Sequence, residues 1–282
     1  MNKGKSFRLF QYGFGFLVAF CTLAPFLWLF ISSVSYQSDL TAVPLSWIPQ
    51  HITFERYSDI FANASNDIAY AFRISMYNSL IVGLWTTVIA LIVGGLAAHA
   101  FARYRFRFKR NMMYLLLFTY MIPSVVIVIP LFSMLQKADM MDAKWKLVLL
   151  DLTFVIPYVI WVMQSYFKYL SAEYYEAAYM DGCTRFQTLR LIILPIVRPG
   201  VVATAIFAFL LAWDEFFFAL LFTSSLDAKT IPVAIAEFSG KNGVDYGMVA
   251  TGGVLACLPP ALIAFVFQKY LVTGMTAGGV KE

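Results

Sequence analysis

Charged side chains are scarce in this sequence. Asp, Glu, Lys and Arg account for 13% of its 282 residues, while 61% are hydrophobic; a soluble domain averages about 25% charged residues. Several uncharged stretches reach roughly 20 residues, the length of a membrane-spanning helix. The shortage of charge excludes an ordinary soluble domain, because most of this chain has to lie in a medium that does not hydrate ions.

Cysteine and histidine are also rare. Cys21, Cys183 and Cys257 show no spacing typical of a metal site or a disulfide framework, and His51 and His99 stand far apart. The sequence contains no Gly-x-x-x-x-Gly-Lys-Ser/Thr loop, and its polar segments are too short for a nucleotide-binding domain. We therefore expect no metal, no catalytic residue and no cofactor in this chain, so that any ATP hydrolysis would belong to a separate subunit.

Six apolar stretches are long enough to cross a bilayer, and lipid favours helices because their backbone groups pair within the segment. These stretches cover residues 13–34, 78–102, 111–136, 147–167, 200–224 and 247–268. The first is longer than the apolar region of a signal peptide. The sequence therefore predicts an all-α polytopic membrane protein with six transmembrane helices and a single domain over about residues 74–270.

The distribution of Lys and Arg predicts the orientation. With the N-terminus in the cytoplasm, 14 of the 21 basic residues fall in cytoplasmic segments, as the positive-inside rule requires. Those segments are 1–12, 103–110, 168–199 and 269–282, and the extracytoplasmic ones include 35–77 and 225–246. We expect both termini in the cytoplasm and the protein in the inner membrane. The basic cluster at 103–110 lies between two spans, a poor place for binding nucleic acid.

The longest cytoplasmic segment, 168–199, predicts two short helices. Ser171 and Thr184 are suited to cap their N-termini, Gly182 to the left-handed position after the first helix, and Pro195 to the end of the second. Acidic residues on the first helix and an apolar stripe on the second favour docking to a protein partner. Packing of this segment on the chain's own bundle explains the same pattern equally well.

The same segment carries a spaced motif, formed by Glu176-Ala177-Ala178, Gly182, Ile192 and Leu194-Pro195. It closely resembles the EAA loop of the permeases of binding-protein-dependent ATP-binding-cassette importers, which docks in a cleft of the ATPase subunit. The resemblance implies a type I importer permease bundle. It also implies that the ATPase-coupling residues are Glu173, Glu176, Ala177, Ala178, Asp181, Gly182, Ile192, Leu194 and Pro195.

Two further stretches narrow the resemblance to carbohydrate permeases. Residues 213–216, Trp-Asp-Glu-Phe, are similar to a Trp-Asn-Glu-Phe segment of that group, with Asp214 in place of Asn. The tail, residues 267–281, resembles that of the smaller subunit of maltose- and trehalose-type permeases, the MalG-like branch. In that branch the tail reaches the ATPase dimer, which implies contacts by Thr276, Gly278, Gly279 and Lys281. Taken without the resemblance, this tail is better interpreted as a frayed terminus.

Asp214 and Glu215 lie within the predicted fifth span. Because charge inside a membrane is costly, such residues should face a cavity or a partner. We interpret Trp213, Asp214 and Glu215 as candidate gate or pathway residues, with pairing at the outer rim as the alternative. No substrate-binding residue is predicted.

Together these patterns predict a permease subunit of an ATP-binding-cassette sugar importer that forms half of the translocation pathway. The expected partners are a homologous larger permease subunit, two ATPase subunits carrying ATP and Mg²⁺, an extracytoplasmic sugar-binding protein and membrane lipid. Disaccharides or oligosaccharides are expected on the resemblance alone. The alternative is an ion-gradient-driven secondary transporter, which the intramembrane acids suit but in which the cytoplasmic loop has no purpose. A membrane enzyme would need a cluster of catalytic side chains that the sequence lacks.

Overall fold

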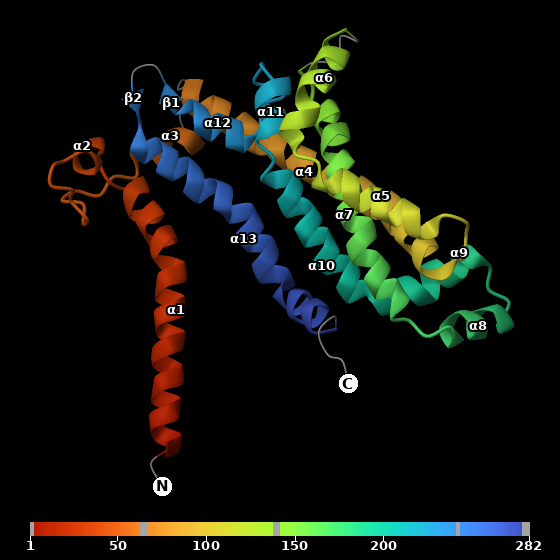
Figure 1. Ribbon diagram of the computed structural model, residues 1–282. Helices are drawn as coiled ribbons and strands as arrows, with labels where there is room; N and C mark the ends of the chain where they lie inside the picture. The colour runs from red at the N-terminus through yellow and green to blue at the C-terminus, as the bar shows by residue number, and fades with distance from the viewer. Residues whose placement is uncertain (1–2, 63–66, 138–141, 241–242, 278–282) are drawn as a thin grey trace. The chain divides into compact units, whose positions relative to one another are not determined.

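The protein, as a computed structural model, is built almost entirely of helices (Figure 1). The structure describes residues 3–62, 67–137, 142–240 and 243–277. In chain order the elements are α1 (Lys3–Ser33), α2 (Gln37–Leu40), α3 (Glu55–Ala62), α4 (Asp67–Arg103), α5 (Lys109–Met121), α6 (Ser124–Lys137), α7 (Lys144–Lys168), α8 (Glu173–Met180), α9 (Arg185–Gln187), the π-helix η1 (Thr188–Ile193), α10 (Leu194–Trp213), α11 (Phe217–Phe222), α12 (Ile231–Glu237), β1 (Ser239–Gly240), β2 (Gly243–Val244) and α13 (Tyr246–Ala277).

Within the described residues, five helices are long and apolar enough to cross a membrane. They are Phe10–Ser33 within α1, Asp67–Arg103, Lys144–Lys168, Arg185–Trp213 and Tyr246–Tyr270 within α13. A sixth span exists if α5 and α6 are taken together, although the two helices are bent by 87°. The all-α polytopic fold is thus confirmed, with the third predicted span present as a broken pair of helices.

The break in the third span lies at Ile122 and Pro123. Proline disfavours helical backbone in the residue before it, and Ile122 is indeed extended, with φ −70° and ψ 123°. Its N–H donates to the carbonyl of Thr119, which closes α5, and α6 begins directly after the proline (Figure 1). The predicted third span, 111–136, is thus interrupted at an X-Pro step. Pro130 and Pro157, by contrast, lie inside α6 and α7.

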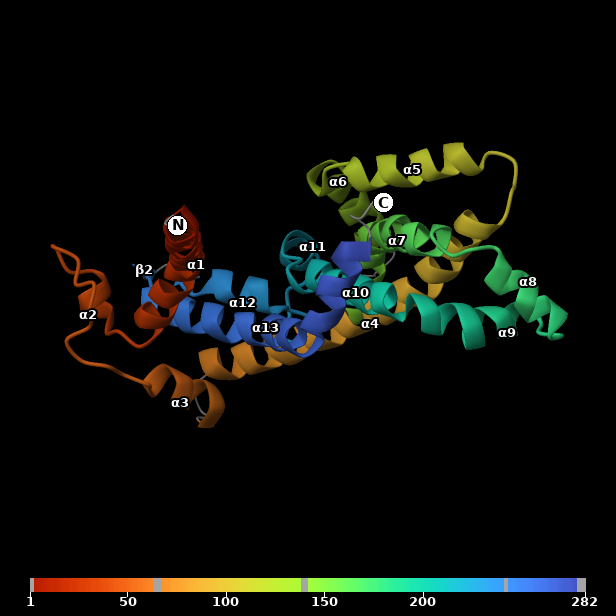
Figure 2. The ribbon, with the colours of Figure 1, turned by 90° about the horizontal axis from the view of Figure 1, so that it is seen from below.

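The prediction that Pro195 ends a helix was wrong. The chain is helical from Arg185 through η1 to Trp213, and Figure 2 shows α9 and α10 in one continuous run. Pro195 falls in the first turn of α10, where the missing N–H costs little. The wider π-turn before it closes with a bond from the Leu194 N–H to the carbonyl of Leu189. The helix then ends at Trp213, so the predicted span 200–224 is divided before α11.

The chain folds into two compact units, which are considered separately. The first unit comprises Met1–Arg73 and Ala234–Pro259. Arg56 connects several segments of this unit. The Arg56 Nη1 donates to the carbonyls of Ser35 at 2.7 Å and Ser33 at 3.3 Å, and the Arg56 Nε lies 3.9 Å from an Asp245 carboxylate oxygen. The guanidinium also lies directly against Gly247, where any side chain would collide with it.

The second unit, Ile74–Val233 and Pro260–Glu282, contains the larger core. Val155 and Val159 of α7 and Ile193 of η1 are fully buried. Three glycines let the long helices approach one another closely: Gly83 faces Phe209, Gly94 faces Val159, and Gly200 faces the ring of Tyr166. A Cβ at any of these glycines would come within 2.9 Å of the facing side chain. Because interiors are close-packed, α4, α7 and α10 are held in one arrangement.

Candidate functional site

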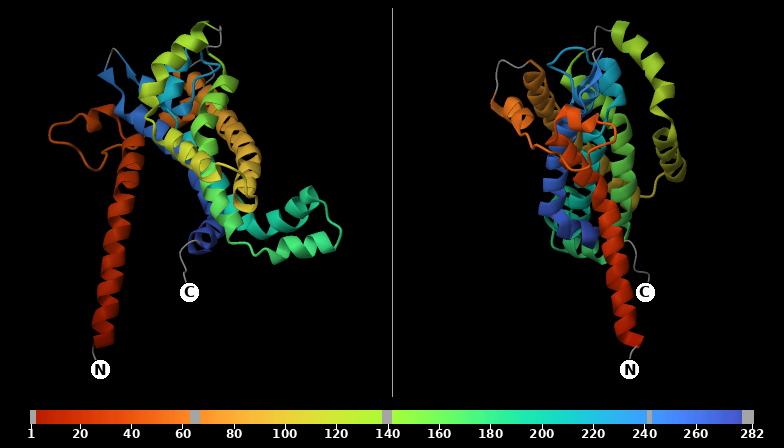
Figure 3. Two further views of the ribbon diagram at one scale, coloured as in Figure 1. Left: turned by 45° about the vertical axis from the view of Figure 1, so that its right-hand side comes forward. Right: turned by 90° about the vertical axis from the view of Figure 1, so that its left-hand side faces the viewer.

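The predicted coupling segment forms a helical hairpin in the second unit. α8 and α9 are its two arms, joined at Gly182 (Figure 3). The backbone of Gly182 is left-handed, with φ +76°. Its N–H donates to the carbonyl of Tyr179 at 3.1 Å, and that of Cys183 donates to Ala178 at 2.9 Å. This pair of bonds is a Schellman motif, so the left-handed position predicted for Gly182 is confirmed.

The second arm begins with a capping box. The Thr184 hydroxyl accepts from the Gln187 N–H at 3.3 Å, and the Gln187 side chain accepts from the Thr184 N–H at 2.8 Å. The predicted cap at Thr184 is therefore confirmed. In the first arm the N-cap is Ala172 and not the predicted Ser171. Ser171 lies one residue before the N-cap, and its hydroxyl accepts from the Glu173 N–H at 3.3 Å. Both arms thus have their first N–H groups partly satisfied locally.

The two faces of α8 have different surroundings. Tyr175 and Ala178 are 3% and 1% exposed and face their own chain. Glu173, Glu176 and Ala177 are exposed, as are Asp181 and Gly182 beyond the helix. The two alanines, both predicted to contact an ATPase, therefore lie on different faces of α8. Ala178 packs against its own chain, and Ala177 is exposed. The exposed part of α8 thus combines acidic side chains with Ala177 and with the large side chains of Tyr174, Tyr179 and Met180.

Tyr175 fastens α8 to the membrane helices. Its ring stacks on His99 of α4 with centroids 5.8 Å apart, and the Arg103 guanidinium carbon lies 4.3 Å from the ring centre. His99 in turn meets Phe167 of α7 edge-on at 5.4 Å. Burial raises the pKa of the Tyr175 phenol, against a smaller lowering by Arg103, so the ring stays neutral at physiological pH. A movement of α8 is thereby passed to the ends of α4 and α7.

The second arm connects to the bundle through the backbone. Thr188, Leu189 and Ile193 of η1 are buried, whereas Phe186 is 66% exposed. The predicted apolar stripe on this arm therefore packs mostly on its own chain. π-Turns of this kind are frequent at functional positions. Since the helix continues unbroken to Trp213, a displacement of the hairpin acts on α10 as a lever.

The remaining predicted coupling residues lie along this lever. Ile192 packs against the core, while Leu194 and Pro195 are exposed on the first turn of α10. All nine predicted coupling residues therefore lie on one continuous structural element, from Glu173 to Pro195. Their contacts with an ATPase stay a prediction.

The residues Trp213, Asp214 and Glu215 lie where α10 ends. Trp213 is 3% exposed and stacks on Phe209 with centroids 5.4 Å apart. Asp214 is exposed, and the Glu215 carboxylate turns forward to accept from the N–H groups of Phe218 at 2.7 Å and Ala219 at 2.9 Å. Glu215 thus caps α11 and holds the break in the helix. A gating role of these three residues stays a prediction.

The segment after α11 is fastened by side chains distant in sequence. The buried Asn78 amide donates to the carbonyls of Leu226 at 2.9 Å and Lys229 at 2.8 Å, and the Ser79 hydroxyl accepts from the Ile231 N–H at 2.8 Å. Asp142 adds a further attachment. Its carboxylate accepts from the N–H groups of Ser224 and Ser225, both at 2.9 Å.

The charge of Asp142 is stabilised by these bonds. Partial burial raises the pKa of its carboxyl, but the hydrogen bonds from Ser225 and Ser224 outweigh burial and hold that pKa below its ordinary value of 3.8. The carboxylate is thus ionised at neutral pH and continues to accept the hydrogen bonds from the Ser224 and Ser225 N–H groups. The segment from Glu215 to Ile231 is in this way attached to α4 and to the start of α7.

Sequence reasoning assigned no role to Tyr175, to the Asn78-Ser79 pair or to the buried Asp151. Tyr175 stood beside the motif but had no signal of its own, because its role depends on His99 and Arg103 from another helix. The Asn78-Ser79 pair was visible as a polar step opening an apolar run. Asp151 is 1% exposed in α7, and neither carboxylate oxygen has a hydrogen-bond partner among the described residues.

The predicted tail contacts lie at the edge of what the structure describes. Thr276 belongs to the last turn of α13. Gly278, Gly279 and Lys281 lie outside the described residues. Among the described residues, no group of His, Cys, Asp and Glu is arranged to hold a metal ion.

Comparisons with known proteins agree with this architecture. The family of binding-protein-dependent transport system inner membrane components matches residues 90–277. The trehalose transport system permease protein SugB of Mycobacterium tuberculosis is 36% identical over 267 residues, which cover 94% of each chain. The trehalose/maltose transport system permease protein MalG of Thermococcus litoralis is 33% identical over 266 residues, again covering 94% of each chain.

A solved structure supports the fold. A chain of a bacterial ABC transporter involved in the import of the acidic polysaccharide alginate superposes with a TM-score of 0.74 and 21% identity, covering 96% of this chain and 98% of that one. At this identity the likeness concerns the fold alone, and it confirms the predicted importer permease bundle. The chain is therefore a multi-pass membrane protein that belongs to the family of binding-protein-dependent transport system inner membrane components.

Proposed function

We propose that this chain is a permease subunit of an ATP-binding-cassette sugar importer and that its α8–α9 hairpin receives the stroke of an ATPase subunit. The observation that carries the proposal is the hairpin itself. Its outer face is exposed and carries acidic side chains beside Tyr174, Tyr179 and Met180, its inner face is attached through Tyr175, and its second arm continues into α10. A surface that is free outside and rigidly connected inside is suited to transmit force.

The proposed orientation places the hairpin in the cytoplasm. It follows from the excess of Lys and Arg in segments 1–12, 103–110, 168–199 and 269–282. Both termini then lie in the cytoplasm, and the segment from Glu215 to Ile231 lies at the outer side. The attachments of that segment to Asn78, Ser79 and Asp142 make it the counterpart of the hairpin at the other end of the bundle.

In the proposed mechanism the chain itself does no ATP chemistry. ATP and Mg²⁺ bind to a pair of ATPase subunits, whose closure moves α8 together with η1. The lever formed by η1 and α10 tilts, and α4 and α7 follow because Tyr175 joins α8 to His99 and Arg103. With a homologous larger permease subunit forming the other half of the pathway, the bundle opens outward and accepts solute from an extracytoplasmic binding protein.

The proposed solute is a disaccharide or oligosaccharide. Two relatives are named for trehalose and for trehalose/maltose transport, and the chain covers nearly their full length. This chain supplies no substrate contact that we assign. The sugar is best identified by screening ligands against the binding protein that co-purifies with the complex.

The test is an energy-source experiment on the reconstituted complex. Proteoliposomes holding the permease pair and the ATPase are supplied outside with the loaded binding protein and inside with Mg-ATP or a non-hydrolysable analogue. We expect sugar uptake only with hydrolysable ATP and only with the binding protein. Uptake driven by an imposed proton or sodium gradient without the ATPase would instead support a secondary transporter.

A further inference from the structure

A pocket of about 760 Å³ lies between the start of α5 and the end of α7 in the second unit. Its lining contains three cations, Lys109, Arg110 and Lys168, and no acidic residue. The other lining residues are Phe106, Phe108, Asn111, Met113, Tyr114 and Gln164. None of the three cations takes part in a salt bridge within the described part of the chain. The pocket is thus a concentration of positive charge that the chain leaves without a counter-charge.

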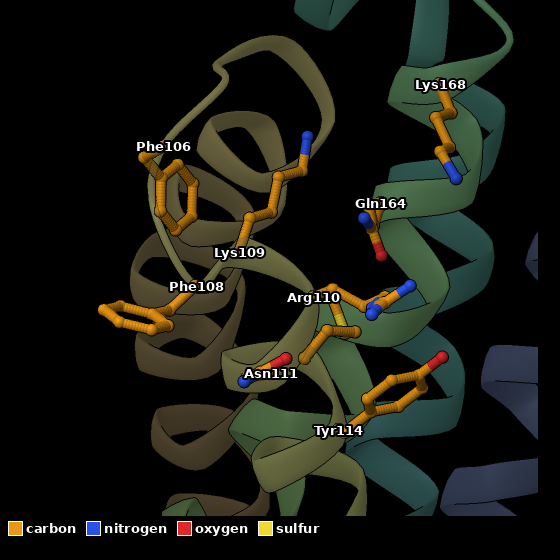
Figure 4. A pocket seen from close by; sticks show the side chains of 9 residues that line it. Phe106, Phe108, Lys109, Arg110, Asn111, Tyr114, Gln164 and Lys168 are labelled. Atoms are coloured by element: carbon orange, nitrogen blue, oxygen red, sulfur yellow. The ribbon is translucent and has the colours of Figure 1, made fainter.

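The donors in this pocket converge. Figure 4 shows Arg110 extending from α5 toward α7, with the side chains of Gln164 and Lys168 directed toward the same gap and the Tyr114 ring beside it. Lys109 lies slightly apart, since its Nζ donates to the carbonyl of Tyr104 at 3.0 Å. A guanidinium, an ammonium and an amide around one gap suit a phosphate group, because Arg can bind two of its oxygens at once.

The start of α5 adds to this preference. Phe108 is its N-cap and provides no side-chain hydrogen bond, and of the first N–H groups only that of Lys109 donates to a described residue before the N-cap, the carbonyl of Phe106 at 3.3 Å. The positive end of the helix dipole also favours an anion here. Together with the three cations, it makes a site for a negatively charged group rather than for a neutral sugar.

The surroundings favour a lipid over a dissolved anion. On α5, next to the pocket, Leu115 and Phe118 are 62% and 63% exposed and Met112 is 48% exposed, a surface suited to acyl chains. Phe106 and Phe108, which line the pocket, are exposed as well and add to the apolar surface. The cationic pocket and an exposed apolar surface thus belong to the same helix, α5, which suits a head group joined to its tails.

From this juxtaposition we propose that the pocket between α5 and α7 binds the phosphate head group of an anionic phospholipid of the cytoplasmic leaflet. Basic pockets between transmembrane helices on that side suit such head groups. Within the second unit α5 packs mainly on α7, and the break at Pro123 separates it from α6. A lipid bound between α5 and α7 would therefore stabilise the packing of α5.

The test measures lipid bound to the purified permease complex. The complex is placed in nanodiscs of phosphatidylcholine, with or without phosphatidylglycerol, and retained lipid is quantified by native mass spectrometry. We expect the double variant Arg110→Gln/Lys168→Gln to bind phosphatidylglycerol roughly 30-fold more weakly, at about five-fold per charge. The matched control, Arg105→Gln/Arg107→Gln, removes the same amount of charge from the segment just before α5, outside the pocket lining, and should lose only a few-fold.

Three results would overturn the proposal. An equal loss in the two double variants would mean diffuse attraction to an anionic surface. Displacement of phosphatidylglycerol by inorganic phosphate alone would mean a site for a free anion, and no selective retention by the unaltered complex would mean no lipid site. If the double variant does not assemble, the charge-preserving Arg110→Lys/Lys168→Arg variant replaces it, and it should retain phosphatidylglycerol.

Discussion

Replacing Gly182 with Ala should loosen the coupling hairpin through backbone conformation alone. The residue has φ +76°, which L-residues other than Asn and Asp adopt reluctantly. A Cβ built at this position meets nothing within 4 Å, so no steric clash contributes to the effect. The substitution therefore isolates the cost of placing a side chain on a left-handed backbone, about 1–2 kcal/mol.

That cost should appear in the exchange of two amides. The N–H groups of residue 182 and Cys183 donate to the carbonyls of Tyr179 and Ala178, and they are released when the turn opens. A cost of about 1–2 kcal/mol raises the open population roughly 5- to 30-fold. Hydrogen exchange of the purified complex should show a loss of protection of that size at Cys183, accompanied by weaker stimulation of the ATPase by the loaded binding protein.

The matched control is Gly182→Asn. Asparagine tolerates the left-handed region better than alanine does, so protection at Cys183 should fall less than in the alanine variant. Two outcomes refute this reasoning. One is unchanged protection in the alanine variant, and the other is a greater loss with Asn than with Ala, which would mean that the conformation at residue 182 is not what holds the turn.

Two further predictions concern the ends of the bundle. Tyr175→Leu removes the stacking on His99 and the contact with Arg103, together about 1–3 kcal/mol, so the amide hydrogens of α8 should exchange faster as a whole. The control Tyr174→Leu, at a position 48% exposed, should leave amide exchange in α8 unchanged. Equal effects of the two variants would contradict the anchoring role. Asp142→Asn keeps the shape but removes the charge, costing about 1 kcal/mol at neutral pH. Because the pKa of Asp142 is lowered in the folded protein, its contribution is present above the ordinary pKa and lost as pH falls through the folded pKa. The difference in Tm between wild type and variant should thus shrink in acid, and a constant difference from neutral to acid pH would contradict this.

Local backbone chemistry was predictable where one residue type decides the outcome. Gly182 and Thr184 were placed correctly because a left-handed C-terminus and a capping box depend on the residue itself and its near neighbours. The apolar spans were predictable for a similar reason, since their length and lack of charge reflect the membrane directly.

The prolines show where such reasoning ends. Pro123 and Pro195 both follow an apolar helical stretch, yet only the first breaks the helix. Pro195 falls after a π-turn at the start of α10, and the tertiary packing of Thr188, Leu189 and Ile193 holds that turn. Whether a proline bends or merely begins a helix depends on these contacts, which no local pattern contains.

Long-range side-chain contacts were equally out of reach. Ala177 and Ala178 were both expected among the coupling residues, but a helix turns about 100° per residue, and Ala178 packs inward while Ala177 is exposed. The partners of Asn78 lie some 150 positions further along the chain. The carboxylate of Glu215 accepts from the N–H groups of Phe218 and Ala219, a local cap that the apolar sequence following it concealed, and its predicted gate or pathway role stays a prediction.

The central claim is that the exposed face of α8 drives the bundle, and charge reversal of Glu176 tests it most directly. Glu176→Lys is compared with Glu55→Lys, which reverses an exposed charge in the first turn of α3 in the other unit. ATP-driven sugar uptake and ATPase retention are measured on the same reconstituted complexes. The account predicts that Glu176→Lys loses both while Glu55→Lys keeps both; normal uptake with the ATPase fully retained in the Glu176→Lys complex would contradict it.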